Sequence, residues 1–170
     1  AVTSCKGGVG KSTVAANLAL SLSAVGYKIG ILDADIYGPS IPKILKITEK
    51  PEVNEKKKIL PLKFKEIEVI SIGLLVDERK PIIWRGPMIQ SALMQLVSNV
   101  NWSNLDVLIL DLPPGTGDPH LTLMQKLNIS HSIVVTTNEE VAIADTRKVI
   151  NMLLKLNIPI SFNFQIIISS

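Results

Sequence analysis

A glycine-rich turn between an apolar segment and a helical segment is the feature that most constrains this chain. The turn covers residues 5–13, with the sequence Cys-Lys-Gly-Gly-Val-Gly-Lys-Ser-Thr. Its glycines let the backbone bend so that successive N–H groups point into one concavity, where a phosphate chain accepts hydrogen bonds. The helix that begins near Lys11 adds its positive N-terminal end. This segment therefore predicts a binding site for a nucleoside triphosphate.

The side chains of this loop have predicted roles in holding ATP and a magnesium ion. Lys11 reaches the β- and γ-phosphates as a point charge, and the Ser12 hydroxyl ligates Mg²⁺. The other nucleotide-binding residues that we expect in the loop are Gly7, Gly8, Val9, Gly10 and Thr13. Cys5 stands where an ordinary phosphate loop has its first glycine, and we expect it to be a packed small residue rather than a ligand.

A second lysine, Lys6, makes this a deviant phosphate loop of the form K-G-G-x-G-K-[ST]. In deviant loops this signature lysine reaches the nucleotide of a facing subunit. Lys6 therefore predicts a dimer, of identical or different subunits, that encloses nucleotide at its interface, with Lys6 completing the catalytic site of the partner. The competing interpretation is a glycine-rich turn with two solvated lysines.

Composition is consistent with one compact enzyme domain. The chain has 170 residues, 46% of them hydrophobic and 4% aromatic, which is enough for one sizeable aliphatic core. We expect residues 1–170 to form a single P-loop ATPase domain, truncated at both ends, with a lysine-rich loop or insertion at 46–66. The run Lys56-Lys57-Lys58 has no aromatic residue interleaved for base stacking, so we do not expect nucleic-acid binding there.

Cysteine content and hydropathy narrow the cellular compartments in which we expect this protein. The single cysteine cannot form an internal disulfide, which is typical of a reducing compartment. The longest apolar runs, such as 29–32 and 107–110, are strand-sized, so we expect no membrane partner. We expect a cytoplasmic protein, or one in a plastid or mitochondrion, because a targeting segment upstream of Ala1 would have been lost.

Short apolar runs alternate with longer amphipathic stretches, which predicts an α/β fold: a doubly wound, mostly parallel sheet with helices on both faces. We expect strands at 1–4, 28–33, 67–72, 107–111, 132–137 and 158–168. We expect helices at 11–25, 86–100, 119–127 and 141–156. In the last helix the predicted core face consists of Val141, Ala144, Val149, Met152, Leu153 and Leu156.

Two aspartates stand at the end of the second expected strand, where open α/β sheets bind their ligands. Asp33 and Asp35 lie two residues apart and share a face of an extended chain. We assign Asp35 to orienting the attacking water, and Asp33 either to the surroundings of the magnesium ion or to a structural role. The competing interpretation is a strand end with solvated carboxylates.

A third aspartate ends the strand expected at 107–111, in a Walker B pattern. Asp111 would hold a water bound to magnesium. Residues 113–118, Pro-Pro-Gly-Thr-Gly-Asp, follow at once. Gly115 in this loop can bring its backbone N–H to the γ-phosphate and change conformation when that group leaves. The order of these three motifs predicts a nucleotide-dependent switch.

Several segments together resemble the Mrp-type P-loop ATPases, the ApbC- and Nbp-like iron-sulfur cluster carriers of the SIMIBI class. They are residues 5–13, 33–40, 84–88 (Trp-Arg-Gly-Pro-Met), 111–118 and 121–122. The phosphate loop resembles the plastid-type branch in particular. The resemblance implies a dimer that holds a [4Fe-4S] cluster, passes it to apo iron-sulfur proteins, and hydrolyses ATP slowly to gate that transfer.

Two features depart from the family pattern. The family bridges its cluster with a Cys-x-x-Cys pair, and these 170 residues contain no such pair, so the resemblance places no cluster ligand here. Gln165 and Ile166 stand where the family has a Glu-Asn pair whose Asn contacts adenine.

We expect His120 to be a surface residue at a helix start. We expect Arg85, beside Trp84, either to anchor a turn or to face the partner.

The sequence is compatible with two other functions. One is a switch ATPase that positions a partner on DNA or membrane, which would need a basic surface or a C-terminal amphipathic helix. The other is a degenerate ATP-binding scaffold without cluster ligation, which the missing Cys-x-x-Cys pair favours.

Overall fold

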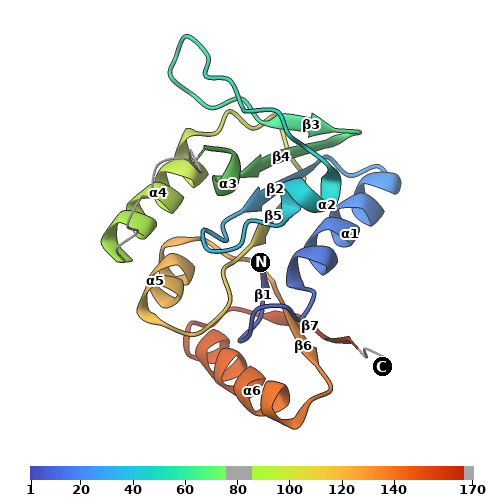
Figure 1. Ribbon diagram of the computed structural model, residues 1–170, viewed down its shortest axis with the longest axis vertical. Helices are drawn as coiled ribbons and strands as arrows, with labels where there is room; N and C mark the ends of the chain where they lie inside the picture. The colour runs from blue at the N-terminus through green and yellow to red at the C-terminus, as the bar shows by residue number, and fades with distance from the viewer. Residues whose placement is uncertain (76–85, 167–170) are drawn as a thin grey trace.

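Seven strands form one sheet in the computed structural model, which describes residues 1–75 and 86–166 (Figure 1). The strand order is β3-β4-β2-β5-β1-β6-β7, and all neighbours run parallel except β3 and β4. The strands are β1 Val2–Thr3, β2 Ile29–Asp33, β3 Leu62–Phe64, β4 Ile67–Ser71, β5 Val107–Asp111, β6 Ser132–Thr137 and β7 Ile160–Ile166. The helices are α1 Lys11–Ala24, α2 Ile41–Leu45, α3 Ile72–Leu75, α4 Gly86–Asn99, α5 Asp118–Lys126 and α6 Glu140–Lys155. The predicted mostly parallel sheet is confirmed.

Helices cover both faces of the sheet, so the fold is doubly wound as predicted (Figure 1). One core cluster joins α1 and α2 to the sheet, and the other joins α4, α5 and α6 to its opposite face. Every residue of β2 and β4 is buried, because these strands lie inside the sheet and are covered on both faces. Three alanines of α1, at most 1% exposed, let this helix approach the strands closely: Ala15, Ala16 and Ala19.

Strand register brings the predicted site residues together. Asp33 at the end of β2 pairs with Asp111 at the end of β5, and Asp111 in turn pairs with Val2 of β1. The phosphate loop leaves β1 a few residues later and leads into α1. The carboxyl ends of parallel strands meet at one edge of a sheet, so both aspartates lie beside the loop.

The structure adds three short elements that were not predicted: α2, α3 and β3. Their brevity gives no periodic pattern, and α2 carries a proline in its first turn. Gly73 in α3 allows the loop after β2 to pass closely, since a Cβ there would lie 2.5 Å from Pro39 Cγ. All four predicted helices, and all predicted strands except the one at 158–168, agree with the structure within one residue at each boundary.

The predicted core face of α6 is wrong in part. Val141 is 65% exposed and Ala144 is exposed, whereas the buried positions are Ala142, Thr146, Val149, Met152 and Leu153. The buried face includes a threonine, which a purely apolar pattern excludes. Thr146 Oγ1 donates a hydrogen bond to the Ala142 carbonyl at 2.7 Å, and this bond lets the hydroxyl be buried.

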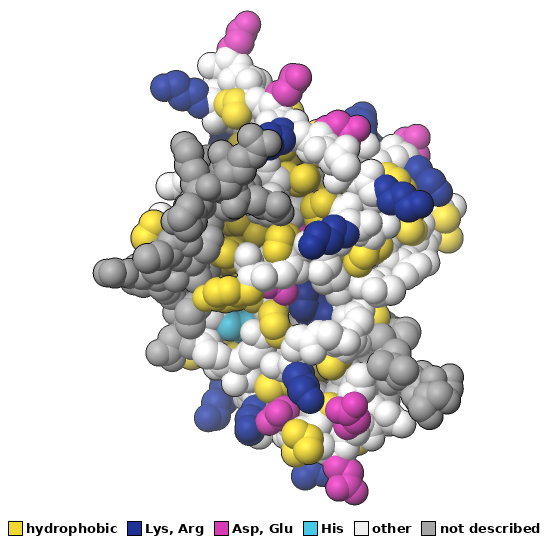
Figure 2. Space-filling view, viewed as in Figure 1, with side chains coloured by type: hydrophobic (Ala, Val, Ile, Leu, Met, Phe, Trp, Pro, Cys, Tyr) yellow, Lys and Arg dark blue, Asp and Glu magenta, His cyan; other side chains and the backbone are white. Residues whose placement is uncertain are grey.

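The lysine-rich segment 46–66 contains β3 and a short antiparallel contact between Val53 and Ile59. Its turn is held by Asn54, whose Oδ1 accepts hydrogen bonds from two backbone N–H groups. Phe64 stands between Lys63 and Lys65, so one aromatic residue does accompany these lysines. On the face in Figure 2, lysine and arginine are interspersed with aspartate and glutamate. Nucleic-acid-binding surfaces instead carry clustered positive charge.

None of the helices in residues 1–75 and 86–166 combines the length and the apolar character that crossing a membrane requires.

Candidate functional site

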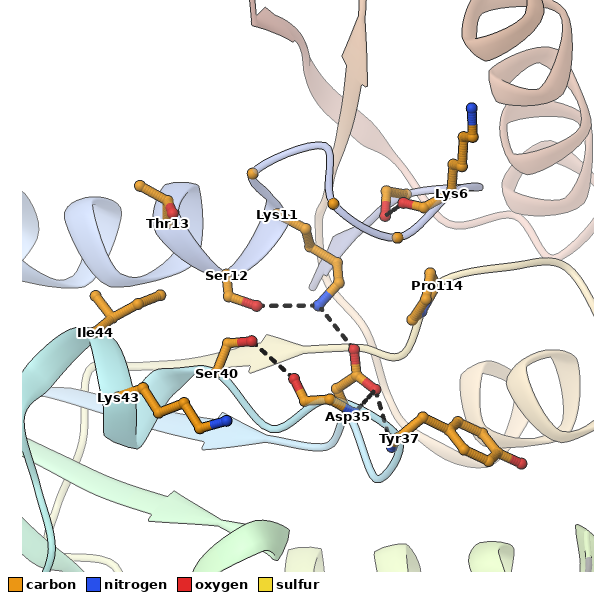
Figure 3. A pocket seen from close by; sticks show the side chains of 15 residues that line it. Lys6, Lys11, Ser12, Thr13, Asp35, Tyr37, Ser40, Lys43, Ile44 and Pro114 are labelled. Atoms are coloured by element: carbon orange, nitrogen blue, oxygen red, sulfur yellow. Dashed lines mark hydrogen bonds and ion pairs between the residues drawn. The ribbon is translucent and has the colours of Figure 1, made fainter.

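A cleft of about 670 Å³ lies at the carboxyl edge of the sheet, and the phosphate loop forms one of its walls (Figure 3). The loop contributes Gly7, Gly8, Gly10, Lys11, Ser12 and Thr13. The opposite wall comes from the segment after β2, with Asp35, Tyr37, Gly38, Ser40, Lys43 and Ile44, and Pro114 of the switch loop lies at one end. The cleft therefore contains most of the residues that the sequence predicted to bind nucleotide.

The backbone of the loop adopts conformations that require glycine. Gly8 and Gly10 have φ angles of 79° and 86°, in the left-handed region that side chains disfavour. Gly10 precedes α1 directly, and its carbonyl accepts a hydrogen bond from the Val14 N–H at 2.9 Å. Val9 is buried and anchors the loop to the core, while Thr13 is exposed at the cleft. The first turn of α1 thus faces the cleft with its N-terminal end.

Lys11 lines the cleft and directs its ammonium toward Asp35 (Figure 3), and it also contacts Asp111, which is buried behind the cleft lining. Its Nζ donates a hydrogen bond to Asp111 Oδ1 at 2.6 Å and lies 3.8 Å from Asp35 Oδ2. The Ser12 hydroxyl accepts from the same Nζ at 3.4 Å. Lys11 is only 6% exposed, so these contacts take place away from bulk water. Four predicted site residues, Lys11, Ser12, Asp35 and Asp111, therefore form one network.

Asp111 is fully buried, and one of its oxygens has no protein partner. Burial raises the pKa of this carboxyl, and the charge and hydrogen bond of Lys11 oppose the rise. Within the described residues, Oδ2 has no hydrogen-bond donor. An unpaired buried carboxylate oxygen beside the Ser12 hydroxyl fits a site for Mg²⁺ and its bound water.

The two aspartates after β2 differ in their contacts. Asp35 Oδ1 accepts from the N–H groups of Tyr37 and Gly38, both at 3.2 Å, and its other oxygen faces Lys11. Asp33 is fully buried away from the cleft, and burial, with the nearby charge of Asp111, raises its pKa to about 7. Of the two roles considered for Asp33, these contacts favour the structural one.

Asp33 holds the start of α2 and the end of β4 together. Its Oδ2 accepts hydrogen bonds from Ser40 N, Ile41 N and Ser71 Oγ, at 3.1, 3.2 and 3.0 Å. Its Oδ1 accepts from the Asp35 N–H at 3.1 Å. Both oxygens are therefore occupied by protein donors, and the loop carrying Asp35 is fixed through Asp33.

Lys6 lines the cleft without pointing toward Lys11, and Gly115 follows Pro114 at one end of the cleft. Lys6 extends away from the Lys11 network, and its Nζ lies 3.8 Å from Glu139 Oε2 (Figure 3). The Gly115 N–H donates to the Ser4 carbonyl at 2.9 Å, and its φ of 109° requires glycine. To meet a γ-phosphate, the Gly115 N–H would have to release Ser4, which is the kind of movement predicted for a switch.

Sequence reasoning missed three side chains on the wall opposite the phosphate loop: Tyr37, Ser40 and Lys43. Tyr37 and Ser40 belong to the 33–40 motif, and the place of this motif directly after β2 indicated that they could line the site. Lys43 lies in α2, a helix too short to be predicted. Trp84 and Arg85 lie outside the described residues, and Gln165 and Ile166 lie in β7 beside β6.

The prediction that His120 lies on the surface is wrong. His120 is 4% exposed, and its Nε2 lies 3.4 Å from Thr3 Oγ1. Burial lowers the pKa of His120 to about 4, so the imidazole is neutral at pH 7. The first turn of α5 faces inward under the switch loop, and this tertiary placement has no signature in the local sequence.

Comparison with known proteins assigns this chain to one family. Residues 1–163 match the family model described as the NUBPL iron-transfer P-loop NTPase, of ParA type. An iron-sulfur cluster carrier protein from Pseudomonas fragi is 49% identical over 162 residues, covering 94% of this chain and 56% of the relative. This chain spans about half the length of the curated relatives it matches.

Two solved structures share the fold. A nucleotide-binding protein from Archaeoglobus fulgidus in complex with ADP has a TM-score of 0.81 and 36% identity, over 95% of this chain and 63% of that one. The septum site-determining protein MinD from Pyrococcus horikoshii, complexed with Mg-ADP, has a TM-score of 0.71 at 23% identity, over 95% of this chain and 67% of that one. The second likeness shows the fold alone.

The buried neutral His120 predicts an acid-sensitive contribution to stability. Its pKa is about 4 in the folded state against 6.5 when unfolded, so the unfolded chain binds more protons between these values. The difference in free energy of unfolding between wild type and His120→Gln should therefore fall as pH is lowered from 6.5 to 4, by up to about 3 kcal/mol. Urea unfolding at several pH values measures it.

Taking the difference removes the contribution of Asp33, which has the opposite sign. Its raised pKa makes the folded state bind more protons, so its contribution rises as pH falls from about 7. His131→Gln, at an exposed histidine, is the matched control and should keep the wild-type profile. A His120→Gln variant whose profile parallels the wild type would show that His120 is not held neutral by burial.

Proposed function

This chain belongs to the NUBPL family of iron-transfer P-loop NTPases, and from that premise we propose that it is the ATP-binding and slowly hydrolysing part of an iron-sulfur cluster carrier. The observation that carries this proposal is the network in which Lys11, Ser12 and Asp35 of the cleft lining meet the buried Asp111. It combines a phosphate-binding cation, a hydroxyl for a metal ion and two buried acids in one site.

Nucleotide binding in this proposal exchanges the partners of Lys11. The β- and γ-phosphates draw the Lys11 ammonium away from Asp111, and the loop N–H groups stabilise the charge that develops on the bridging oxygen. Mg²⁺, when bound, neutralises phosphate charge, and Ser12 and Asp111 are the residues that would hold it. The unpartnered Oδ2 of Asp111 supports that role.

Asp35 is the residue proposed to orient the attacking water. Two backbone N–H groups hold its Oδ1, which leaves Oδ2 directed at the centre of the cleft. A carboxylate held in this way can accept a hydrogen bond from water without changing its own position. The fixed loop behind Asp35 supports this assignment.

We propose that two subunits enclose the nucleotide, with Lys6 completing the site of the partner. Its side chain is 55% exposed, and its contact with Glu139 is an exposed pair, so little free energy opposes its release. Gly115 also lies near the cleft. We propose that its N–H exchanges the Ser4 carbonyl for the γ-phosphate when that group is present. The dimer can consist of identical or different subunits.

The cluster is the cargo of this proposed carrier, and apo iron-sulfur proteins are its proposed clients. A [4Fe-4S] cluster takes cysteine ligands, and these 170 residues contain only Cys5. Burial raises the pKa of the Cys5 thiol, which disfavours the thiolate that binds iron. Cys5 therefore does not fit a cluster ligand, and the proposal places the ligands outside these residues. In the described residues, no group of three or more metal-binding side chains occurs.

The alternative of a positioning switch rests only on fold likeness. A degenerate scaffold would bind ATP without hydrolysing it, and turnover assays on the intact protein would distinguish it from the carrier.

The proposed location of the protein is a reducing compartment, either the cytoplasm or an organelle.

The proposal predicts that Lys11→Met abolishes high-affinity ATP binding. Loss of its charge-assisted hydrogen bonds to the phosphates should weaken ATP binding on the order of 100-fold in calorimetric titrations with Mg²⁺. The same change leaves Asp35 and Asp111 without a counter-ion, and we expect the free energy of unfolding to fall by about 3 kcal/mol or more.

The double variant Lys11→Met with Asp111→Asn separates the two effects. Removing the second buried charge should restore most of the stability, while ATP binding stays weak because no cation meets the phosphates. If Lys11→Met binds ATP as the wild type does, the cleft is not the nucleotide site and the proposed function fails.

The dimer makes a second prediction. With ATP and Mg²⁺, the molar mass of the wild type in light scattering should double, whereas Lys6→Ala should stay monomeric and keep its ATP affinity within a few-fold. Glu139→Gln, which removes the intrachain partner of Lys6, is the matched control and should still dimerise. Equal dimerisation of Lys6→Ala would contradict a role for Lys6 across the interface.

A further inference from the structure

Within residues 1–75 and 86–166, one lysine of the cleft has no carboxylate beside it to neutralise its positive charge. Three lysines line the cleft: Lys6, Lys11 and Lys43. Lys6 lies 3.8 Å from Glu139, and Lys11 lies 2.6 Å from Asp111 and 3.8 Å from Asp35. Among the residues that the structure describes, Lys43 has no carboxylate within 4.0 Å.

The position of Lys43 is fixed by the core, although its side chain is exposed. It lies in α2, between Ile41, which is fully buried, and Leu45, which is 4% exposed. Asp33 accepts hydrogen bonds from the N–H groups of Ser40 and Ile41, which holds the first turn of this helix. The backbone of Lys43 therefore cannot move away from the cleft without breaking contacts in the core.

The Lys43 side chain extends from α2 toward the part of the cleft that Ser40 and Asp35 line (Figure 3). Ser12 lies on the facing wall, and it is the residue expected beside the β- and γ-phosphates. A lysine with four rotatable side-chain carbons can place its ammonium over a range of positions in such a space. Lys43 thus faces the place where the terminal phosphates of a nucleotide would lie.

The charges around Lys11 explain why a further cation matters. Lys11 is outnumbered by its two carboxylate neighbours, Asp35 and Asp111, so this buried group carries net negative charge and repels an incoming polyphosphate. The Lys11 ammonium is also engaged with Asp111 at 2.6 Å. Lys43, which has no carboxylate within 4.0 Å among the described residues, is therefore available to attract phosphate at the start of binding.

We propose that Lys43 is a phosphate-binding residue that meets the β- and γ-phosphates of the nucleotide and draws them into the cleft before Lys11 exchanges Asp111 for phosphate. This inference rests on the proposed function, since it takes the ligand of the cleft to be a nucleoside triphosphate. Its consequence is that Lys43 contributes to the preference for ATP over nucleotides with fewer phosphates.

The test compares Lys43→Gln, Lys43→Arg and a matched control, Lys50→Gln, which removes the same charge from an exposed lysine outside the cleft lining. Calorimetric titrations with ATP, ADP and AMP in Mg²⁺ are repeated at two salt concentrations. We expect Lys43→Gln to weaken ATP binding about tenfold, ADP binding less and AMP binding not at all. Its ATP affinity should also depend less on salt, because one screened attraction is gone.

The controls decide between a site and a general effect of charge. Lys43→Arg should stay within about threefold of the wild type, since it keeps the cation, and Lys50→Gln should bind as the wild type does. Lys43→Gln with wild-type affinities, or Lys50→Gln with the same loss, would overturn the inference and leave the proposed function standing. A wild-type chain that binds no ATP would overturn both. Thermal unfolding by circular dichroism verifies that each variant is folded.

Discussion

The buried ion pair between Lys11 and Asp111 is the interaction on which the candidate site depends. It joins the first residue of α1 to the last residue of β5, so it fixes the phosphate loop against the centre of the sheet. Both side chains are buried, and breaking such a pair from one side leaves a buried charge without a partner. The pair is thus a structural contact and, in the proposed cycle, the contact that a nucleotide must replace.

The rest of the site follows from parallel strands that end at one edge. β2 and β5 are in register at Asp33 and Asp111, and the phosphate loop continues from β1 beside them. Asp33 then uses both carboxylate oxygens to hold the loop after β2 and the start of α2. The wall opposite the phosphate loop, with Asp35 and Lys43, is positioned by this one buried carboxylate.

The sheet, the family and the four residues of the Lys11 network could be predicted from the sequence, because they depend on motifs at strand ends and on alternating apolar runs. The family resemblance is confirmed, while assignment to a plastid-type branch stays a prediction. Tertiary features were not predictable: the burial of His120, the inward face of α6 at Ala142 and Thr146, and the α2 helix that presents Lys43. Each depends on which elements pack together, and the local sequence pattern does not determine that packing.

The most direct test of this account is the dependence of ATP affinity on Mg²⁺. When Lys11 moves to the phosphates, Asp111 loses the ion pair at 2.6 Å that balances its charge, so ATP and Mg²⁺ should bind with strong positive coupling. We predict that removing Mg²⁺ weakens ATP binding to the wild type at least about tenfold, and that Asp111→Asn, which needs no counter-charge, loses most of this coupling. ATP affinity that is the same with and without Mg²⁺ in the wild type would contradict the exchange of Lys11 between Asp111 and phosphate.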